Sequence, residues 1–583
     1  MSLYNQMENF SVTVSASSRA VGRRVVPALL SAAVLAACST TKPLDPLIGD
    51  TGQPLSVIAQ QADVQHYALE LEIMPDQQQI AGVGRTEFLL LQPTSAVELK
   101  LDSRFVISRI TVDDQEARYQ RVGGVLTIAL GAEKPAQSKV QVAVYYSGKP
   151  HVAKNAPWSG GTVWSKTATG EHFVATAVQG EGCDLFWPCK DHFSDKANTM
   201  HISLTVPAGL SAVTNGVLQN IEPLPGNKQR FNWLLSVPAS DYNIALNIGP
   251  YTRISQTYQS VNGAIVPLEF WAVQQNVDKA KALIQDDVLG QLAFFERKLG
   301  PYPWGDQKMG VVETPHLGME HQTVNAYGKG YKRDEYGFDW LLHHELAHEW
   351  FGNLMTHEKL NDAWLHEGFG LYMQPAYALE KLGTAAYHYQ MYKSYLGLQN
   401  CDPVVRKGVI TSDQAFNPDI YGKGGWTLHT LRYLIGDDKF WQATRELLYG
   451  RADTAQLQYP ITPRYRNTAE FIAIVNRISG QDLQWLFDVY LYEAALPELV
   501  AVRSADQLQL SWKTPGNTRF PMPVEVSING ELTTLDFSKG PVSIPLKSSD
   551  QLLIDPQMKV LRQLPIIGSC EEVRAKVKNK RAD

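Results

Sequence analysis

Residues 342–350 read LHHELAHEW, and this short segment carries the most specific chemical pattern in the chain. His344 and His348 are four positions apart, so on a helix both imidazoles leave the same face, one turn apart, and can bind one metal ion. Glu345 adjoins the first histidine and is placed to bond a water on that metal. A chain of this composition is expected to contain HExxH roughly 0.02 times by chance. The segment therefore predicts a helix that carries two zinc ligands and a base.

A second segment, residues 364–370, reads WLHEGFG and supplies a third ligand. A catalytic zinc needs three protein ligands and one open position. Glu367 follows His348 after eighteen intervening residues, which is enough for a loop and a return to the metal. The full spacing is much more specific than the pentapeptide alone.

Two further expectations concern the neighbours of these ligands. Asn361 and Asp362 are residue types that cap helix N-termini, so they predict the start of the helix that carries Glu367. His343 and His366 each flank a ligand and therefore point away from the metal, so both are expected to be structural.

Composition limits the class of protein around these segments. The chain has 583 residues, of which 44% are hydrophobic and 19% are charged, which is typical of a globular protein with several domains. The 53 basic residues against 59 acidic ones argue against nucleic acid as a partner. Five cysteines are too few for a disulfide scaffold. Cys183 and Cys189 are close enough in sequence to pair, although buried thiols are the favoured interpretation.

The N-terminus has the features of an export signal. Arginines precede an apolar run at residues 25–37, which is too short to span a bilayer. Residues 35–38, LAAC, resemble the lipobox of bacterial lipoproteins, in which the cysteine, here Cys38, is lipidated after cleavage. By the same resemblance, Ser39 in place of Asp indicates the outer membrane of a Gram-negative cell, facing the periplasm. The alternative is an ordinary signal peptide with a chance cysteine.

Periodicity predicts a multidomain α+β protein. After the signal peptide (1–37) and a polar tether (38–61), strand alternation predicts an N-terminal β domain. Helical spacing of apolar residues then predicts a mostly helical domain, which contains the histidine motifs. Strand patterns near the end predict a small β-sandwich followed by a tail. The predicted bounds of these four parts are 62–249, 250–497, 498–564 and 565–583.

These segments together resemble a known family, the gluzincin zinc aminopeptidases that include aminopeptidase N and leukotriene hydrolase. The family motifs HELAHQWFGN and WLNEGFA stand here as HELAHEWFGN and WLHEGFG. The GxMEN motif is matched by residues 318–321, GMEH, in which His321 replaces the final Asn. The resemblance implies that Glu320 binds the free α-amino group of the substrate, beside Gly318 and Met319.

The resemblance also implies roles for residues outside the two histidine motifs. Residues 421–424, YGKG, are similar to the family's Tyr-x-Lys-Gly, whose tyrosine, here Tyr421, donates to the oxyanion. Gln179, ten residues before Cys189, matches a second contact to the amine, and Glu181 is a competing assignment. The implied fold is a β-saddle, a thermolysin-like catalytic domain and a β-sandwich. The large helical C-terminal domain of many members has no counterpart here, so an open cleft is expected.

The implied function is hydrolysis of the N-terminal residue from peptides that have a free amine. One Zn²⁺ per chain, on His344, His348 and Glu367, would activate a water, with Glu345 as general base. The expected partners are such peptides and, through Cys38, a membrane. Two alternatives stay open: a non-catalytic binding or assembly protein on the same fold, and another hydrolase activity, endopeptidase or epoxide hydrolase, at the same zinc site.

Overall fold

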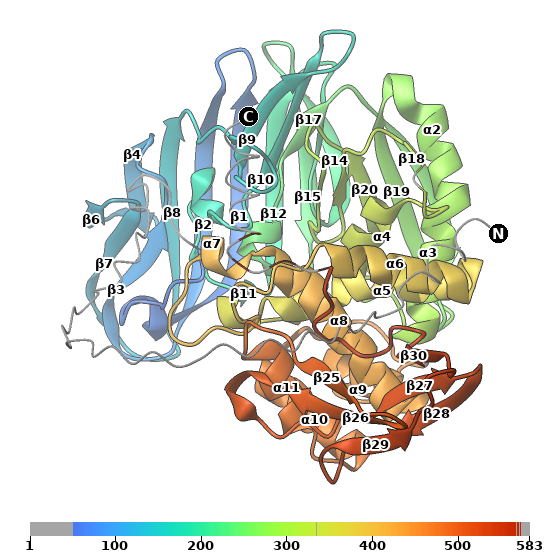
Figure 1. The fold of residues 1–583 in the computed structure, drawn as a ribbon. Helices are drawn as coiled ribbons and strands as arrows, with labels where there is room; N and C mark the ends of the chain where they lie inside the picture. The colour runs from blue at the N-terminus through green and yellow to red at the C-terminus, as the bar shows by residue number, and fades with distance from the viewer. Residues whose placement is uncertain (1–50, 334, 567, 569, 571, 573–583) are drawn as a thin grey trace, which may run out of the picture.

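The computed structural model describes residues 51–333, 335–566, 568, 570 and 572. The predicted signal peptide, Cys38 and most of the predicted tether lie outside these residues. The described chain has a β-rich N-terminal part, a helical middle part and a small β part at its C-terminal end (Figure 1). Among the described residues, no helix combines the length and the apolar character needed to cross a membrane.

The largest sheet forms the body of the N-terminal part. Its strand order is β14-β15-β12-β1-β2-β8-β4-β5. Tyr67, Leu69 and Leu71 on β1 are buried while their neighbours are partly or fully exposed, as the alternation predicts. β1 runs parallel to β12 and antiparallel to β2. The strands span β1 (Ala62–Met74), β2 (Gln79–Leu90), β4 (Phe105–Val112), β5 (Gln115–Glu116), β8 (Lys139–Gly148), β12 (Thr199–Pro207), β14 (Val217–Leu224) and β15 (Lys228–Leu235).

Three smaller sheets complete the N-terminal part, with strand orders β3-β7-β6, β13-β17-β10-β9 and β11-β16. Their strands span β3 (Thr94–Lys100), β6 (Tyr119–Val122), β7 (Val125–Lys134), β9 (Gly161–Lys166), β10 (His172–Ala177), β11 (Lys196–Ala197), β13 (Ser211–Val213), β16 (Ala239–Ser240) and β17 (Asn247–Gly249).

The middle part contains a five-stranded sheet as well as helices. Its strand order is β18-β19-β20-β22-β21, so the GMEH motif lies on and just after an edge strand. The sequence patterns missed β20 because all five of its residues are buried, which removes the alternation that marks a strand. The strands span β18 (Tyr251–Gln259), β19 (Ile265–Val273), β20 (Met309–Glu313), β21 (Gly318–Met319) and β22 (Asn325–Tyr327).

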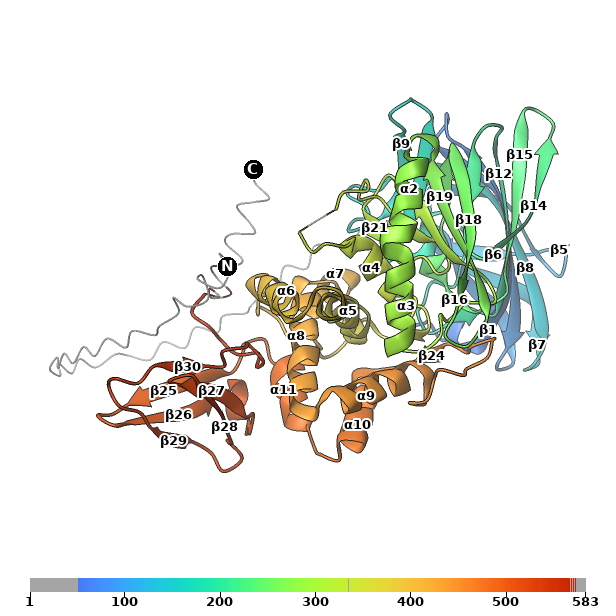
Figure 2. The ribbon, with the colours of Figure 1, turned by 90° about the vertical axis from the view of Figure 1, so that its right-hand side faces the viewer.

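The helices of the middle part lie between this sheet and the C-terminal β part, with α5, α6 and α8 near the centre (Figure 2). They span α2 (Val277–Leu283), α3 (Leu289–Lys298), α4 (Trp340–Ala347), α5 (Trp364–Leu382), α6 (Thr384–Leu396), α7 (Ser412–Ala415), α8 (Pro418–Ile435), α9 (Asp437–Tyr449), α10 (Thr468–Ser479) and α11 (Gln484–Leu491).

The C-terminal part is a sandwich of two three-stranded sheets, β25-β26-β29 and β28-β27-β30, as the strand patterns predict. It encloses its own apolar cluster, which includes Leu510, Val524 and Val526. The α+β class predicted from the sequence is therefore confirmed. The strands span β25 (Glu498–Arg503), β26 (Gln507–Lys513), β27 (Val524–Ile528), β28 (Glu531–Leu535), β29 (Val542–Pro545) and β30 (Leu552–Ile554).

The structure corrects the interpretation of the cysteines. Cys183 and Cys189 form a disulfide, so the favoured interpretation as buried thiols is wrong. A 3₁₀ turn that begins at Cys183 folds the short segment back and brings the two sulfurs together. Cys401 and Cys570 form a second disulfide that the sequence did not indicate. This bond ties Cys570, which belongs to the predicted tail, to the middle part.

Two other expectations are corrected. Thr51, inside the predicted tether, is buried and donates to Asp191 Oδ1 at 2.8 Å, so this residue packs against the β-rich part and does not belong to a tether. Asn361 and Asp362 do not cap α5. Instead, Asp362 Oδ1 accepts from the backbone N–H of Thr468 at 2.9 Å and so serves the first turn of α10.

Candidate zinc and peptide site

The three predicted metal ligands lie together. His344 Nε2 and His348 Nε2 are 3.2 Å apart, and Glu367 Oε2 lies 3.4 Å from the first and 3.5 Å from the second. A tetrahedral zinc with bonds of about 2.0–2.1 Å has ligand–ligand distances of about 3.3–3.4 Å. The three donors therefore fit one zinc ion.

Packing and hydrogen bonds hold these ligands in place. The N-cap Asp339 accepts from Leu342 N at 3.0 Å, which starts α4. His348 Nδ1 lies 2.8 Å from the carbonyl oxygen of Phe351, so Nδ1 donates and Nε2 is left for the metal. A Cβ at position 370 would lie 3.1 Å from Cε1 of both imidazoles, so Gly370 in α5 makes room for the pair.

Glu345, the predicted base, is buried against the edge strand β21. A Cβ at position 318 would lie 2.3 Å from Glu345 Oε1, so only Gly318 lets this carboxylate approach the strand. Burial, followed by the charge of Glu320, raises the pKa of Glu345 well above its usual range. The same carboxylate lies within 4.8 Å of a Glu320 oxygen and a His348 ring nitrogen.

Glu320 is held by two donors from the N-terminal part. Gln179 Nε2 donates to Glu320 Oε1 at 2.5 Å, and the Tyr242 hydroxyl donates to the same oxygen at 2.9 Å. This arrangement fixes the rotamer and leaves Oε2 to meet an ammonium group. Glu181 instead accepts from the backbone N–H of Gly160 at 2.6 Å, which favours Gln179 as the second amine contact.

Tyr242 is a residue of this site that sequence reasoning missed. It lies in a 3₁₀ turn, Asp241–Asn243, and its sequence surroundings resemble those of any core tyrosine. Only the contact with Glu320, which is 78 positions away in the sequence, indicates a role.

Tyr421 enters the site because α5 and α8 approach closely. A Cβ at Gly368 would lie 3.1 Å from Gly424 Cα, so glycine on both helices permits the crossing. The ring centroids of Tyr421 and His344 are 6.2 Å apart. Burial and then the charge of Glu367 raise the pKa of Tyr421 well above its usual range, so the phenol keeps the proton that it would donate.

Glu349 anchors the end of α4. Its carboxylate accepts five hydrogen bonds of 2.9–3.0 Å although it is fully buried. One donor, Asn353 Nδ2, also donates to the main-chain oxygen of Glu320 at 3.0 Å. This network therefore ties the metal-binding helix to the segment that carries Glu320. Its donors are Tyr302, Trp304, Thr323, Asn325 and Asn353.

The remaining histidines of the two motifs lie outside the ligand set, as expected. His343 is fully buried against Phe295, with 4.6 Å between the ring centroids. His366 Nε2 accepts a backbone N–H at 3.2 Å. His321, in the position of the family's Asn, is buried near His316, with 6.5 Å between the ring centroids.

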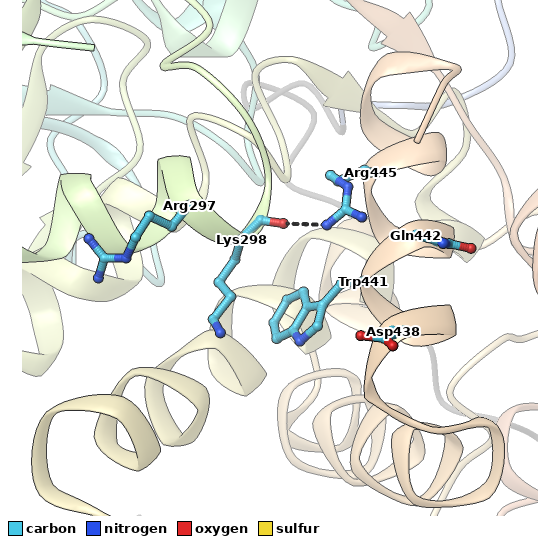
Figure 3. Close-up of a pocket in the computed structure, with 6 residues that line it drawn as sticks. All are labelled: Arg297, Lys298, Asp438, Trp441, Gln442 and Arg445. Atoms are coloured by element: carbon cyan, nitrogen blue, oxygen red, sulfur yellow. Dashed lines mark hydrogen bonds between the residues drawn. The ribbon is translucent and has the colours of Figure 1, made fainter. Parts of the chain in front are cut away.

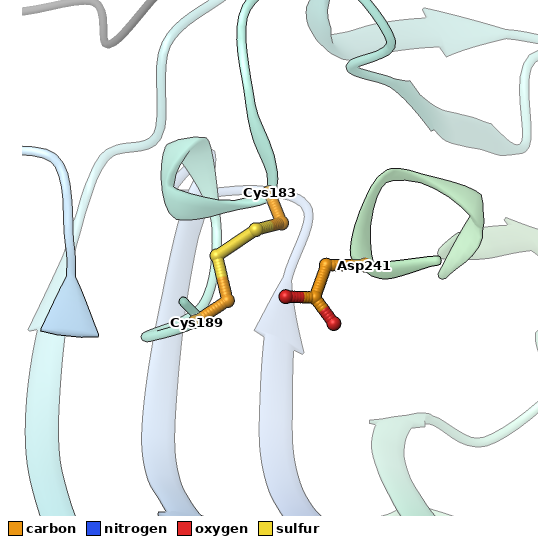
Figure 4. A group of neighbouring side chains, drawn as sticks. All are labelled: Cys183, Cys189 and Asp241. Atoms are coloured by element: carbon orange, nitrogen blue, oxygen red, sulfur yellow. A yellow bond between two sulfur atoms is a disulfide. The ribbon is translucent and has the colours of Figure 1, made fainter. Parts of the chain in front are cut away.

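Cys183, Cys189 and Asp241 are a second group of ligand-type side chains that lie within 4.8 Å of one another (Figure 4). Because the two sulfurs are bonded to each other, neither is a thiolate that can bind a metal. This group is a structural feature of the β part and not a metal site.

A surface pocket of about 280 Å³ lies between α3 and α9 (Figure 3). It is lined by Arg297, Lys298, Asp438, Trp441, Gln442 and Arg445. Its cations already have partners: Arg297 and Lys298 pair with Glu380, and Arg445 donates to the main-chain oxygen of Lys298. The pocket therefore adds nothing to the zinc and peptide site.

Known proteins share this region and fold. Residues 329–490 match the Peptidase family M1 domain. The chain is 22% identical over 437 residues to the Tricorn protease-interacting factor F2 of Thermoplasma volcanium. The aligned region covers 69% of this chain and 50% of that protein. It is 26% identical over 406 residues to aminopeptidase B of Mus musculus. That alignment covers 63% of this chain and 60% of the relative.

A solved structure, a mutant of the M1 zinc metallopeptidase of Deinococcus radiodurans, has the same fold. Its TM-score is 0.63 at 22% identity, over 76% of this chain and 96% of that one. The chain spans about half to three fifths of the length of the two relatives named above.

Proposed function

We propose that this chain, which carries a domain of peptidase family M1, is a zinc-dependent aminopeptidase. One observation supports this most directly: a Glu320 oxygen, a Glu345 oxygen and a His348 ring nitrogen lie within 4.8 Å of one another. A peptide whose ammonium group pairs with Glu320 then presents its first peptide bond, and no later one, to the base and the metal.

The chemistry follows from the residues around that bond. Zinc on His344, His348 and Glu367 would polarise the carbonyl and lower the pKa of a water. Glu345 accepts a proton from the attacking water and returns it to the leaving amine. Tyr421 donates to the carbonyl oxygen as negative charge develops there. Water and peptide become one amino acid and a peptide that is shorter by one residue.

The alternatives fit these contacts less well. An internal peptide segment has no ammonium, so Glu320 would stay buried without a counter-charge, which disfavours an endopeptidase. A pure binding protein has no need of a base beside three metal ligands. Epoxide hydrolysis would use the same residues, so it is left to the assay.

The test is release of chromophore from a panel of aminoacyl anilides by the soluble chain that begins after Cys38. We expect turnover that is lost on zinc chelation, restored by Zn²⁺ and absent with N-acetylated anilides. Cleavage of the acetylated substrates would indicate an endopeptidase. Bound zinc without any turnover would contradict the aminopeptidase proposal, and absence of both would favour the binding-protein alternative.

We also propose that the protein is exported and anchored in the outer membrane by lipid at Cys38, facing the periplasm. The LAAC segment after the apolar run and the Ser39 that follows support this. Expression of the full chain with labelled palmitate in a Gram-negative host tests it. We expect label in the wild-type protein and none in Cys38→Ala, and outer-membrane fractionation of the wild type only. A wild-type protein that takes up no label would contradict the anchor.

A further inference from the structure

A second pair of histidines lies on the outer face of the large sheet, away from the zinc and peptide site. His66 is on β1 and His201 is on the parallel strand β12, where the register places Thr199 opposite His66 and His201 opposite Ala68. Both histidines lie on the side opposite Tyr67, whose side chain faces the core. His66 is partly exposed and His201 is exposed.

The two rings face each other through nitrogen atoms. His66 Nε2 and His201 Nδ1 are 3.3 Å apart, and the ring planes are inclined by 70°. The other nitrogen of His66, Nδ1, lies 2.7 Å from Thr199 Oγ1, which holds the ring with Nε2 toward its partner. The spacing equals the edge of a zinc tetrahedron, about 3.3 Å.

The surroundings keep these nitrogens available for a cation. Burial and then the proximity of His201 lower the pKa of His66, which favours the neutral imidazole that binds metals. A carboxylate is also near: Glu87 on β2 is directly opposite His66 in the antiparallel register. Glu87 pairs with Lys139 at 2.8 Å, and its side chain is partly exposed.

We infer that His66 and His201 form a second metal site, which takes a borderline divalent ion such as Zn²⁺, Ni²⁺ or Cu²⁺, with Glu87 and water completing the coordination. The ion would clamp β1 to β12, the parallel pair that joins the two antiparallel halves of the sheet. An ion that binds only the folded chain stabilises it by mass action.

Calorimetric titration tests this site on the chain already loaded with one equivalent of Zn²⁺. We expect a second binding event with added Zn²⁺, and separately with Ni²⁺. In His66→Ala and in His201→Ala the affinity of this second site for the metal should fall by about 10- to 100-fold or more. Losses of that size follow even from mutation of groups that only support a metal ligand. Aminopeptidase turnover should be unchanged in both variants.

His172→Ala is the matched control. His172 is also a partly exposed strand histidine, but its partner at 2.9 Å is the carboxylate of Asp76 and not a second imidazole. This variant should retain the second binding event. A wild-type titration without that event would overturn the site, as would equal affinity in His201→Ala or equal weakening in His172→Ala. His201 is exposed, so its replacement keeps the test valid if His66→Ala does not fold.

Discussion

The helix pair His344–His348 and the strand pair His66–His201 have nearly the same geometry in very different surroundings. The ring nitrogens are 3.2 Å apart in the helix pair and 3.3 Å apart in the strand pair. The ring planes are inclined by 87° and 70°. Spacing between imidazoles therefore does not distinguish a reactive metal centre from a surface one.

The two pairs differ in whether a third metal donor is already in place and in which side chains surround it. Glu367 already lies 3.4–3.5 Å from both helix nitrogens, and Glu345, Glu320 and Tyr421 line the same space. At the strand pair, Glu87, which is opposite His66 in the register, is paired with Lys139. A fixed third ligand gives tight zinc binding, and buried acid and base groups give chemistry.

The largest effect is expected from removal of the third metal ligand, Glu367. Glu367→Ala should reduce bound zinc from about one per chain to near zero and turnover to background, because two imidazoles alone hold zinc weakly. Metal analysis and the anilide assay measure this. Glu367→Ala that kept its zinc and activity would show that the third donor is not what separates the pairs.

Removal of the base should abolish chemistry while sparing the metal. Glu345→Gln should lower kcat by roughly 10²–10⁴-fold, because no group then takes the proton from the attacking water. Zinc content should remain that of the wild type, since the three ligands are intact. A parallel loss of zinc would mean that Glu345 supports the metal and not the reaction.

Tyr421→Phe tests the oxyanion donor beside the helix pair. We expect kcat to fall by about 10²–10³-fold with little change in KM, because the hydrogen bond forms as charge develops on the carbonyl oxygen. Steady-state kinetics on one anilide measures both constants. A change confined to KM would assign Tyr421 to ground-state binding.

Tyr242→Phe tests the support of the amine-binding carboxylate. Loss of one of two hydrogen bonds to Glu320 Oε1 should raise KM by about tenfold while kcat stays within a few-fold, since a bond to a charged group is worth about 1.5–3 kcal/mol. Tyr251→Phe is the control, because its buried hydroxyl donates at 2.8 Å to the main-chain oxygen of Glu313. Equal KM changes in both variants would indicate a general packing effect.

The smallest effect concerns the strand pair. Saturating Zn²⁺ should raise the Tm of the zinc-loaded wild-type chain by roughly 1–5 °C, and this rise should disappear in His201→Ala. Turnover should be the same in both proteins. Calorimetric melting with and without excess metal measures the shift, and an equal rise in the variant would place the stabilising ion elsewhere.

The sequence predicted some of these residues and missed others for identifiable reasons. The pairing of His344 and His348 could be predicted because helical spacing alone places them on one face. Gln179 and Tyr421 required the family resemblance, since neither has a local pattern. The prediction that Asp362 caps α5 was wrong because its carboxylate accepts a hydrogen bond from the first turn of α10. The cysteine interpretation was wrong because sequence spacing does not report whether two sulfurs meet.

The sequence by itself determined the α+β class, the order of the three parts and the placement of two imidazoles on one helix, with Glu345 beside the first. Each of these depends on the local periodicity of helices and strands, which can be seen in the spacing of residues along the sequence. Only the tertiary structure decided that Tyr242 supports Glu320 and that His66 faces His201, across 78 and 135 positions. Such contacts depend on strand register and on packing between parts, which no local spacing encodes.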